Sequence, residues 1–165
     1  MLTSSATVLA DDPQLNLRLP GEWRQPDRIV LDSNARVPAT AKVWAAGARR
    51  LWLTGGAGRA PEGVEQVTVK PGADGGLNLA DALGVLGAEG VNHVLVECGP
   101  TLAGALLAGR LADEVILYLA PALLGHDARA LAKLPGLERL DQRVQLKFAD
   151  VRQVGADLRL TLAPA

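Results

Sequence analysis

Short apolar runs alternate along this chain with stretches of helical periodicity, and this alternation constrains the fold more than any other feature. Runs of apolar, often β-branched residues that stop at glycine, proline or polar residues predict strands. The apolar runs at 93–97 and 113–121 predict buried strands, the first of them central. Strands that alternate with helices indicate an α/β layer fold with a mostly parallel sheet. The predicted strands are Arg28–Ser33, Arg50–Gly56, Val64–Lys70, His93–Glu97 and Asp113–Pro121.

Two stretches between the strands predict helices. Asn78–Gly90 places Leu79, Leu83 and Leu86 on one face, and its first and last residues are typical of a helix start and a helix end. A shorter helix, rich in small residues, is predicted from Thr101 to Gly109.

The C-terminal part of the chain has a period of two. This alternation predicts two strands, and a turn glycine between them, Gly155, predicts an antiparallel hairpin that closes one edge of the sheet. The alternating residues are Val144, Leu146 and Phe148 in one strand and Leu158, Leu160 and Leu162 in the other.

Composition and charge disfavour several classes of protein. The 165 residues include 17 basic and 18 acidic side chains, for a net charge of −1, and 3% aromatic residues. A nucleic-acid partner needs more cationic surface and more stacking rings. No cation precedes Arg18, as a secretory signal would require, and no apolar run reaches the ~18 residues of a membrane span. We therefore expect a cytoplasmic protein with no nucleic-acid or membrane partner.

The segment VECGPTLAGALLAG (96–109) joins an apolar run to a small-residue helix through a Gly-Pro turn. Unpaired N–H groups at a helix N-terminus can hold a phosphate, and Gly99 and Gly104 allow the backbone to approach closely. The segment matches neither GxGxxG nor a lysine-bearing phosphate loop. The residues alone leave two interpretations open: a nucleotide site, or a tight turn in which Gly104 lets helix and sheet pack closely.

Charged residues stand beside these elements. Glu97 ends an apolar strand and is expected at the cleft on the carboxyl edge of the sheet, with a solvated strand end as the alternative. Asp11 and Asp12 precede Pro13 where a helical turn ends, and adjacent carboxylates do not face each other as an acid–base pair does. Arg18 is either a bidentate phosphate clamp or an unpaired surface arginine.

No pattern of residues indicates a metal site or a thiol nucleophile. His93 and His126 are far apart in sequence, and neither has a cysteine partner at metal-ligand spacing. We therefore expect both to be structural and no metal to be bound. The single cysteine, Cys98, lies in the turn before a predicted helix, but no neighbouring histidine supports it as a nucleophile.

Five segments of the chain occur together, in this order, in one known family. From about Leu2 to Leu162 the chain resembles the reductase domain of the bifunctional riboflavin-biosynthesis deaminase–reductase, and ATVLADDP and VE-x-GPTLAGA are specific in combination. The resemblance implies a dihydrofolate-reductase-like, three-layer α/β/α fold. The segments are TSSATVLADDPQLNLR, RQPDRIVLDSNARVP, VNHVLVECGPTLAGALLAGRLADEVILYLAPALLG, DARALAKLPGLERL and DVRQVGADLRLTL.

The resemblance also implies an activity. The family uses NADPH to reduce 5-amino-6-(5-phosphoribosylamino)uracil to the ribitylamino product, with hydride transfer to the ribosyl C1′. A close variant reduces the pyrimidine before deamination, and the residues do not separate the two. Thr7, Asp11 and Ser33 match positions that contact the cofactor. The positions that match its phosphate loop are Gly99, Pro100, Thr101, Leu102, Ala103, Gly104 and Ala105.

Substrate contacts in the family match Leu15, Arg18 and Glu97. Arg18 is then expected to grip the terminal phosphate, and Glu97 to bind ribose hydroxyls or steer a proton. Asp11 is expected to orient the nicotinamide or assist proton transfer, so Glu97 and Asp11 are the candidate catalytic residues. No arginine stands out as a clamp for a 2′-phosphate, so the preference for NADPH over NADH rests on the resemblance alone.

The chain departs from the family in two residues and in length. Cys98 replaces a usual glycine and is expected to crowd the cofactor, and Ala122 replaces a common lysine. Residues 1–165 match a single reductase domain that lacks its first strand and helix and has no deaminase domain. We therefore expect weak or no activity from this polypeptide alone. The alternative is a truncated, non-catalytic remnant that binds a nucleotide or a partner chain. Family members often dimerise through this domain.

Overall fold

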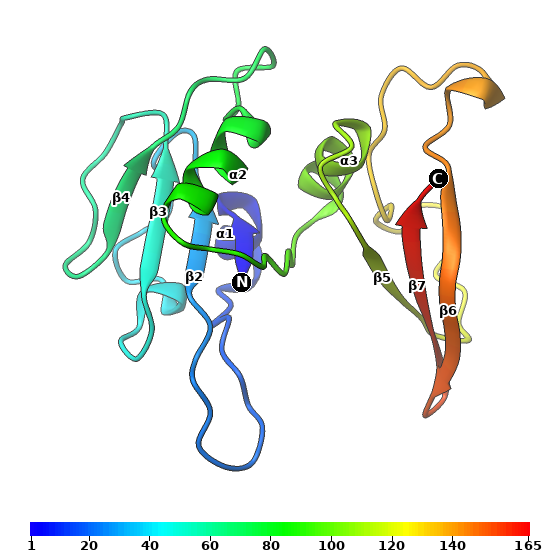
Figure 1. Cartoon of the computed structure of the whole chain (residues 1–165), viewed down its shortest axis with the longest axis horizontal. Coiled ribbons are helices and arrows are strands. Elements are labelled where there is room, and N and C mark those ends of the chain that lie inside the picture. The colour runs from blue at the N-terminus through cyan, green and yellow to red at the C-terminus, as the bar shows by residue number, and fades with distance from the viewer. The chain divides into compact units, whose positions relative to one another are not determined.

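The computed structural model describes all 165 residues and divides into two compact units, Met1–Gly99 and Pro100–Ala165 (Figure 1). The longest helix has ten residues, which is too few to span a bilayer.

The first unit is built on a four-stranded parallel sheet with the order β1-β2-β3-β4. Three of its strands lie within predicted segments, so the predicted parallel α/β sheet is confirmed. No strand is predicted at β1, because three residues are too few to show a period of two. The strands are β1 (Leu2–Ser4), β2 (Arg28–Leu31), β3 (Arg50–Thr54) and β4 (Glu65–Thr68).

The segment His93–Glu97 is not the buried central strand that its apolar residues predict. It forms a single parallel bridge, Val96 opposite Leu2, on the free side of β1. The Leu2 N–H donates to the Leu95 oxygen at 2.8 Å, and the Leu95 side chain remains 53% exposed. The prediction is wrong because an apolar run does not specify how many neighbours a strand will have.

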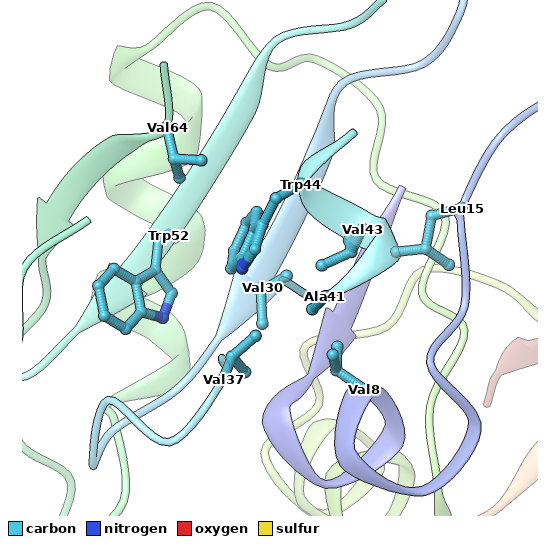
Figure 2. Packing of buried hydrophobic residues seen from close by; sticks show 9 residues of the cluster. All are labelled: Val8, Leu15, Val30, Val37, Ala41, Val43, Trp44, Trp52 and Val64. Atoms are coloured by element: carbon cyan, nitrogen blue, oxygen red, sulfur yellow. The ribbon is translucent and has the colours of Figure 1, made fainter. Parts of the chain in front are cut away.

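One face of this sheet packs against helices and loops that follow β1 and β2. Val30 and Trp52 point from the sheet into a cluster with α1 (Ser5–Asp11) and the 3₁₀ helix η1 (Lys42–Trp44), as Figure 2 shows. The Trp44 and Trp52 rings meet edge to face with their centroids 6.3 Å apart. The buried members are Val8, Leu15, Val30, Val37, Ala41, Val43, Trp44, Trp52 and Val64.

The opposite face of the sheet is covered by α2 (Leu79–Ala88) (Figures 1 and 2). Asn78 caps this helix as predicted, since its side-chain oxygen accepts the Asp81 N–H at 3.0 Å. Gly90 follows the helix with a φ of +82°, a backbone conformation that glycine adopts without strain. Helical layers on both faces make this unit a three-layer α/β structure.

The second unit contains α3 (Pro100–Ala108), η2 (Leu140–Gln142) and a three-stranded antiparallel sheet with the order β5-β7-β6. The predicted C-terminal hairpin is confirmed, with Gly155 in its turn. The hairpin lies in the sheet of its own unit, where β7 pairs with β6 on one side and with β5 on the other. The strands are β5 (Val115–Leu119), β6 (Leu146–Val154) and β7 (Asp157–Pro164).

The strand predicted at Asp113–Pro121 forms as β5, but it is not buried. Tyr118 is 58% exposed and Leu119 is 51% exposed. In the whole second unit only Gly104, Leu106 and Thr161 are buried. Within this unit the predicted burial is not found, because apolar residues become buried only where a second layer of structure covers them.

Candidate functional site

Two predicted cofactor residues, Thr7 and Ser33, follow the carboxyl ends of neighbouring parallel strands. Ser4, which ends β1, lies opposite Leu31, which ends β2. Ser4 also begins α1: its Oγ accepts the Thr7 N–H at 3.4 Å and lies 3.3 Å from the Thr7 hydroxyl. Thr7 and Ser33 are both partly exposed. They therefore stand at the edge of the sheet where α/β proteins usually bind ligands.

Glu97 lies beside the carboxyl end of β1. Its N–H donates to the Leu2 oxygen at 2.9 Å, and its carbonyl oxygen accepts the Thr3 hydroxyl at 2.6 Å. The backbone of Glu97 is thus held by β1, while its carboxylate is exposed and makes no hydrogen bond or ion pair within the chain. An unpaired, positioned carboxylate of this kind can accept hydrogen bonds from a ligand.

A buried carboxylate, Asp32, braces the loop that carries Ser33. Asp32 is 0% exposed, and its Oδ2 accepts the Val37 N–H at 2.8 Å and the Trp52 Nε1–H at 3.2 Å. Its Oδ1 is buried without a partner. Sequence reasoning missed this residue, although an acid directly after an apolar strand was the available signal. Asp32 therefore ties the end of the loop, at Val37, to the end of β2 and to Trp52 of β3.

The same loop carries a cation that sequence reasoning also missed. The guanidinium of Arg36 donates to the Ser5 Oγ at 3.1 Å, and it has no carboxylate partner. Ser5 begins α1, two residues before Thr7, and Arg36 follows Ser33 by three residues. No spacing in the sequence relates Arg36 to Ser5, so only the fold could reveal this contact.

The adjacent aspartates at the end of α1 have different surroundings. Asp11 is exposed and makes no side-chain hydrogen bond. Asp12 takes a left-handed conformation (φ +43°), its Oδ1 accepts the Lys42 N–H at 2.8 Å, and its Oδ2 lies 3.2 Å from the Lys42 Nζ. The backbone hydrogen bond, followed by the side-chain bond, lowers the pKa of the Asp12 carboxyl below its usual value.

The two remaining substrate positions lie in the loop after α1. Leu15 is buried in the core cluster although its φ is +47°, which is rare for a branched side chain. Arg18 is exposed and makes no hydrogen bond or ion pair. The backbone of its neighbour Leu17 is paired at both polar atoms with the Gln25 amide, at 2.9 and 3.4 Å. No hydrogen bond or ion pair joins Arg18 to Asp11 or Glu97.

The predicted phosphate loop is divided by the boundary between the units. Gly99 ends the first unit, and a Cβ added there would meet nothing within 4 Å. Pro100 begins α3, a position that suits proline because its missing N–H would have no helical partner. Thr101 and Ala105 are exposed, while Leu102 and Ala103 are partly buried.

Gly104 is required for packing inside the second unit. A Cβ at this position would lie 1.8 Å from the Lys133 oxygen, and the Lys133 N–H donates to the Pro100 oxygen at 2.8 Å. Close approach at Gly104 is therefore to the backbone of a loop in its own unit. The packing interpretation of this glycine is correct in kind, but the partner is that loop and not a sheet.

The histidines and the cysteine form no catalytic cluster. His126 contacts only its neighbour Asp127, at 3.2 Å, and both are exposed. No group of three or more His, Cys, Asp or Glu residues is placed to hold a metal ion. Cys98 is half-buried and is not among the residues with positive φ, so its side chain causes no backbone strain there.

A hollow of about 570 Å³ lies at the opposite, amino-terminal edge of the sheet, lined in part by Trp23, Arg49 and Glu89. None of the predicted site residues lines it. Arg49 is already paired, with its Nη2 lying 2.8 Å from Glu65 and 2.6 Å from Glu89. These bonds, the larger contribution coming from Glu65, raise the pKa of Arg49 above its usual value. Because ligands of parallel sheets usually bind at the carboxyl edge, the hollow is not the candidate site.

Comparison with known proteins shows the family of the chain. Residues 1–160 match the model of the RibD C-terminal domain. The chain is 45% identical to the riboflavin biosynthesis protein RibD of Escherichia coli (strain K12), over 100% of this chain and 48% of that protein. It therefore spans about half the length of that relative.

Two further proteins are similar over nearly the whole chain. The 5-amino-6-(5-phosphoribosylamino)uracil reductase of Buchnera aphidicola subsp. Acyrthosiphon pisum is 32% identical, over 99% of this chain and 86% of that protein. A crystal form of Acinetobacter baumannii RibD superposes with a TM-score of 0.84 at 35% identity, covering 99% of this chain and 46% of that one.

Proposed function

Because this chain belongs to the RibD C-terminal domain family, we propose that it is an NADPH-dependent reductase of 5-amino-6-(5-phosphoribosylamino)uracil in riboflavin biosynthesis. The observation that carries the proposal is the match to the Buchnera protein. That protein is named for this reduction alone, and this chain covers 86% of it. The part shared by the two proteins is therefore most of a reductase.

The candidate residues fit a protein that mainly aligns two reactants, since the hydride chemistry belongs to the cofactor. When bound, NADPH supplies hydride to C1′ of the ring-opened substrate imine, and the imine nitrogen gains a proton to give the ribitylamine. Glu97 offers an exposed, unpaired carboxylate on a backbone held by β1. We propose that it binds the ribose hydroxyls or steers this proton, and that Asp11 orients the nicotinamide.

For the substrate phosphate, the proposed contact is Arg18. Its guanidinium is exposed and has no partner in the chain, and a planar guanidinium can donate two parallel hydrogen bonds to a phosphate. Leu15 is the other proposed substrate contact. Its left-handed backbone supports this role, because strain in a buried residue is often retained where the backbone serves a ligand.

For the cofactor, Thr7, Asp11 and Ser33 are proposed contacts in the first unit. Gly99, at the end of that unit, and Thr101, Leu102 and Ala103, in the first turn of α3, are proposed to hold phosphates with backbone N–H groups, while Pro100, Gly104 and Ala105 are proposed to lie beside them. The open space at Gly99 fits a group that must come close to the backbone. Arg36 is a further proposed contact: an unpaired cation in the loop of Ser33 can select NADPH over NADH through the 2′-phosphate.

The first experiment is a fluorescence titration of the purified chain with NADPH and with NADH, followed by a hydride-transfer assay on both the deaminated and the non-deaminated substrate. We expect saturable binding with a preference for NADPH, and turnover that falls in Glu97→Gln and Arg18→Ala. Unchanged kcat/KM in both variants would refute the site. Binding without turnover would favour a non-catalytic, nucleotide-binding remnant.

Arg36→Ala tests the cofactor preference separately. Its affinity for NADPH is expected to fall about tenfold or more, since a hydrogen bond to a charged group contributes about 1.5–3 kcal/mol. Its affinity for NADH is expected to stay the same. Arg129→Ala, which removes an exposed cation from the second unit, is the matched control and should leave both affinities unchanged.

A further inference from the structure

Of the two adjacent aspartates at the end of α1, only Asp12 makes side-chain contacts with another element of the structure. Its two carboxylate oxygens divide their contacts, with Oδ1 accepting the Lys42 N–H at 2.8 Å and Oδ2 pairing with the Lys42 Nζ at 3.2 Å. Its own N–H donates to the Val8 oxygen at 2.9 Å and closes the last turn of α1. Asp12 therefore joins the end of α1 to the start of η1.

The Lys42 end of this link is anchored to the sheet. Lys42 begins η1, and the guanidinium of Arg28, at the start of β2, donates to the Val43 oxygen at 3.3 Å and to the Ala45 oxygen at 2.7 Å. Arg50, at the start of β3, donates to the Trp44 oxygen at 2.9 Å. Two neighbouring strands thus hold the carbonyl groups of η1, so Lys42 is a fixed point relative to the sheet.

The other end of the link leads directly into the proposed substrate loop. Asp12 and Leu15 both have positive φ, at +43° and +47°. A left-handed conformation is disfavoured in non-glycine residues, less strongly in aspartate, and it is retained where the surroundings favour it. Burial in the core cluster holds Leu15 in this backbone conformation. The bonds to Lys42 hold Asp12 in it. Arg18 follows three residues after Leu15.

We propose that Asp12 is a positioning residue, which through Lys42 holds the Leu15–Arg18 segment in the geometry that presents Arg18 to the substrate phosphate. This inference rests on the proposed reductase function. Asp12 itself touches neither substrate nor cofactor. Substitutions of Asp11, a proposed cofactor contact, and of Asp12, a positioning residue, should then have different effects on the kinetics.

The chain contains a matched control for this link. Asp81 accepts the Lys70 N–H at 2.9 Å and pairs with the Lys70 Nζ at 3.1 Å, which is the same arrangement at the start of α2. Asp12→Ala and Asp81→Ala therefore remove equivalent contacts from different places. Asp12→Asn keeps an oxygen for the Lys42 N–H, and Lys42→Met keeps that N–H but removes the ammonium.

Hydrogen exchange and steady-state kinetics on the full chain provide the test. We expect Asp12→Ala to raise amide exchange about tenfold at Leu17, whose N–H is hydrogen-bonded to the Gln25 side chain, and to raise the substrate KM about tenfold, with kcat and the NADPH KM within about twofold. Asp12→Asn and Lys42→Met should show smaller shifts in the same direction. Asp81→Ala should leave exchange at Leu17 and the substrate KM unchanged.

Each outcome has a defined meaning. Unchanged exchange at Leu17 in Asp12→Ala would overturn the link, and faster exchange with an unchanged substrate KM would overturn its role in substrate binding. Equal rises in the KM for substrate and for NADPH would mean that Asp12 is only structural. If the wild-type chain has no turnover, the proposed function and the substrate role fail together, while the exchange comparison still decides whether Asp12 holds the loop.

Discussion

The first unit buries its strands, whereas the second unit leaves most of its apolar residues exposed. In β3 of the parallel sheet, Leu51 and Leu53 are 0% exposed, because they lie on the face that α2 covers, opposite the face from which Trp52 enters the η1 cluster. In β6 of the antiparallel sheet, Phe148 is 70% exposed. Strands of equally apolar sequence thus differ widely in how much of their apolar side chains is buried.

The comparison shows which interactions stabilise each unit. The first unit has a dense apolar core, which supplies stability in proportion to the buried area. The second unit depends on the hydrogen-bonded ladders of β5, β7 and β6 and on the contact between Gly104 and Lys133. The proposed residues at Thr7, Ser33 and Glu97 belong to the unit with the core, so their backbones are held rigidly.

The largest expected difference between the units comes from core truncation. Leu51→Ala should lower the free energy of unfolding by about 2–5 kcal/mol, since it leaves a cavity in a packed core. Phe148→Ala should change it by less than about 0.5 kcal/mol, as for other exposed positions. Denaturation can be followed separately, because all three tryptophans lie in the first unit and the one tyrosine lies in the second.

An equal loss in the two variants would contradict this contrast. It would mean that the face of β6 carrying Phe148 is covered in solution, so that its apolar residues contribute to a core after all.

An intermediate effect is expected from Gly104→Ala. The new Cβ would overlap the Lys133 backbone, and overpacking of this kind typically costs about 1–3 kcal/mol. The change should appear as faster hydrogen exchange in α3 and around Lys133, with the tryptophan signal of the first unit unaltered.

Gly84→Ala, in the middle of α2, is the matched control for this substitution. A Cβ there meets nothing within 4 Å, so alanine should stabilise the helix by about 0.5–1 kcal/mol. Stabilisation by both substitutions would show that the loop at Lys133 moves away from α3 without cost.

The smallest expected effect is electrostatic and belongs to the first unit. Hydrogen bonds from Arg49 lower the pKa of Glu65 in the folded chain. Folding therefore gains stability above the ordinary pKa of a glutamate, about 4.3, and loses it as the pH falls toward the lowered value. Glu65→Gln should be slightly less stable than wild type at pH 7, and the gap should close by about pH 3.

Urea midpoints measured by tryptophan fluorescence across this pH range check the effect. A gap between wild type and Glu65→Gln that widened in acid would contradict the assigned pKa direction.

The sequence was sufficient to predict most helices and strands, but not to predict which strands pair with each other. Local patterns predicted β2 to β4, the capped helix α2 and the C-terminal hairpin, because each pattern lies within one short segment. They failed for His93–Glu97, which forms one bridge beside β1, and they did not indicate that the hairpin also pairs with β5. Strand pairing depends on residues that are distant along the chain, and periodicity carries no information about them.

The candidate site divides in the same way. Motifs and resemblance pointed to Thr7, Asp11, Leu15, Arg18, Ser33, Glu97 and the stretch from Gly99 to Ala105 as residues to test. They could not reveal that Asp32 bonds to Trp52, or that Arg36 bonds to Ser5. These contacts join residues that become neighbours only when β1, β2 and β3 pair.

By itself, the sequence determined the α/β class, the family and the residue types available at the site, because these follow from local patterns and motif order. Only the tertiary structure decided which of two adjacent aspartates is tied to Lys42, which glycine lacks room for a side chain, and which apolar strands are buried. The reason is physical: hydrogen bonding and burial depend on what surrounds a residue in space, and that environment exists only after distant segments have packed together.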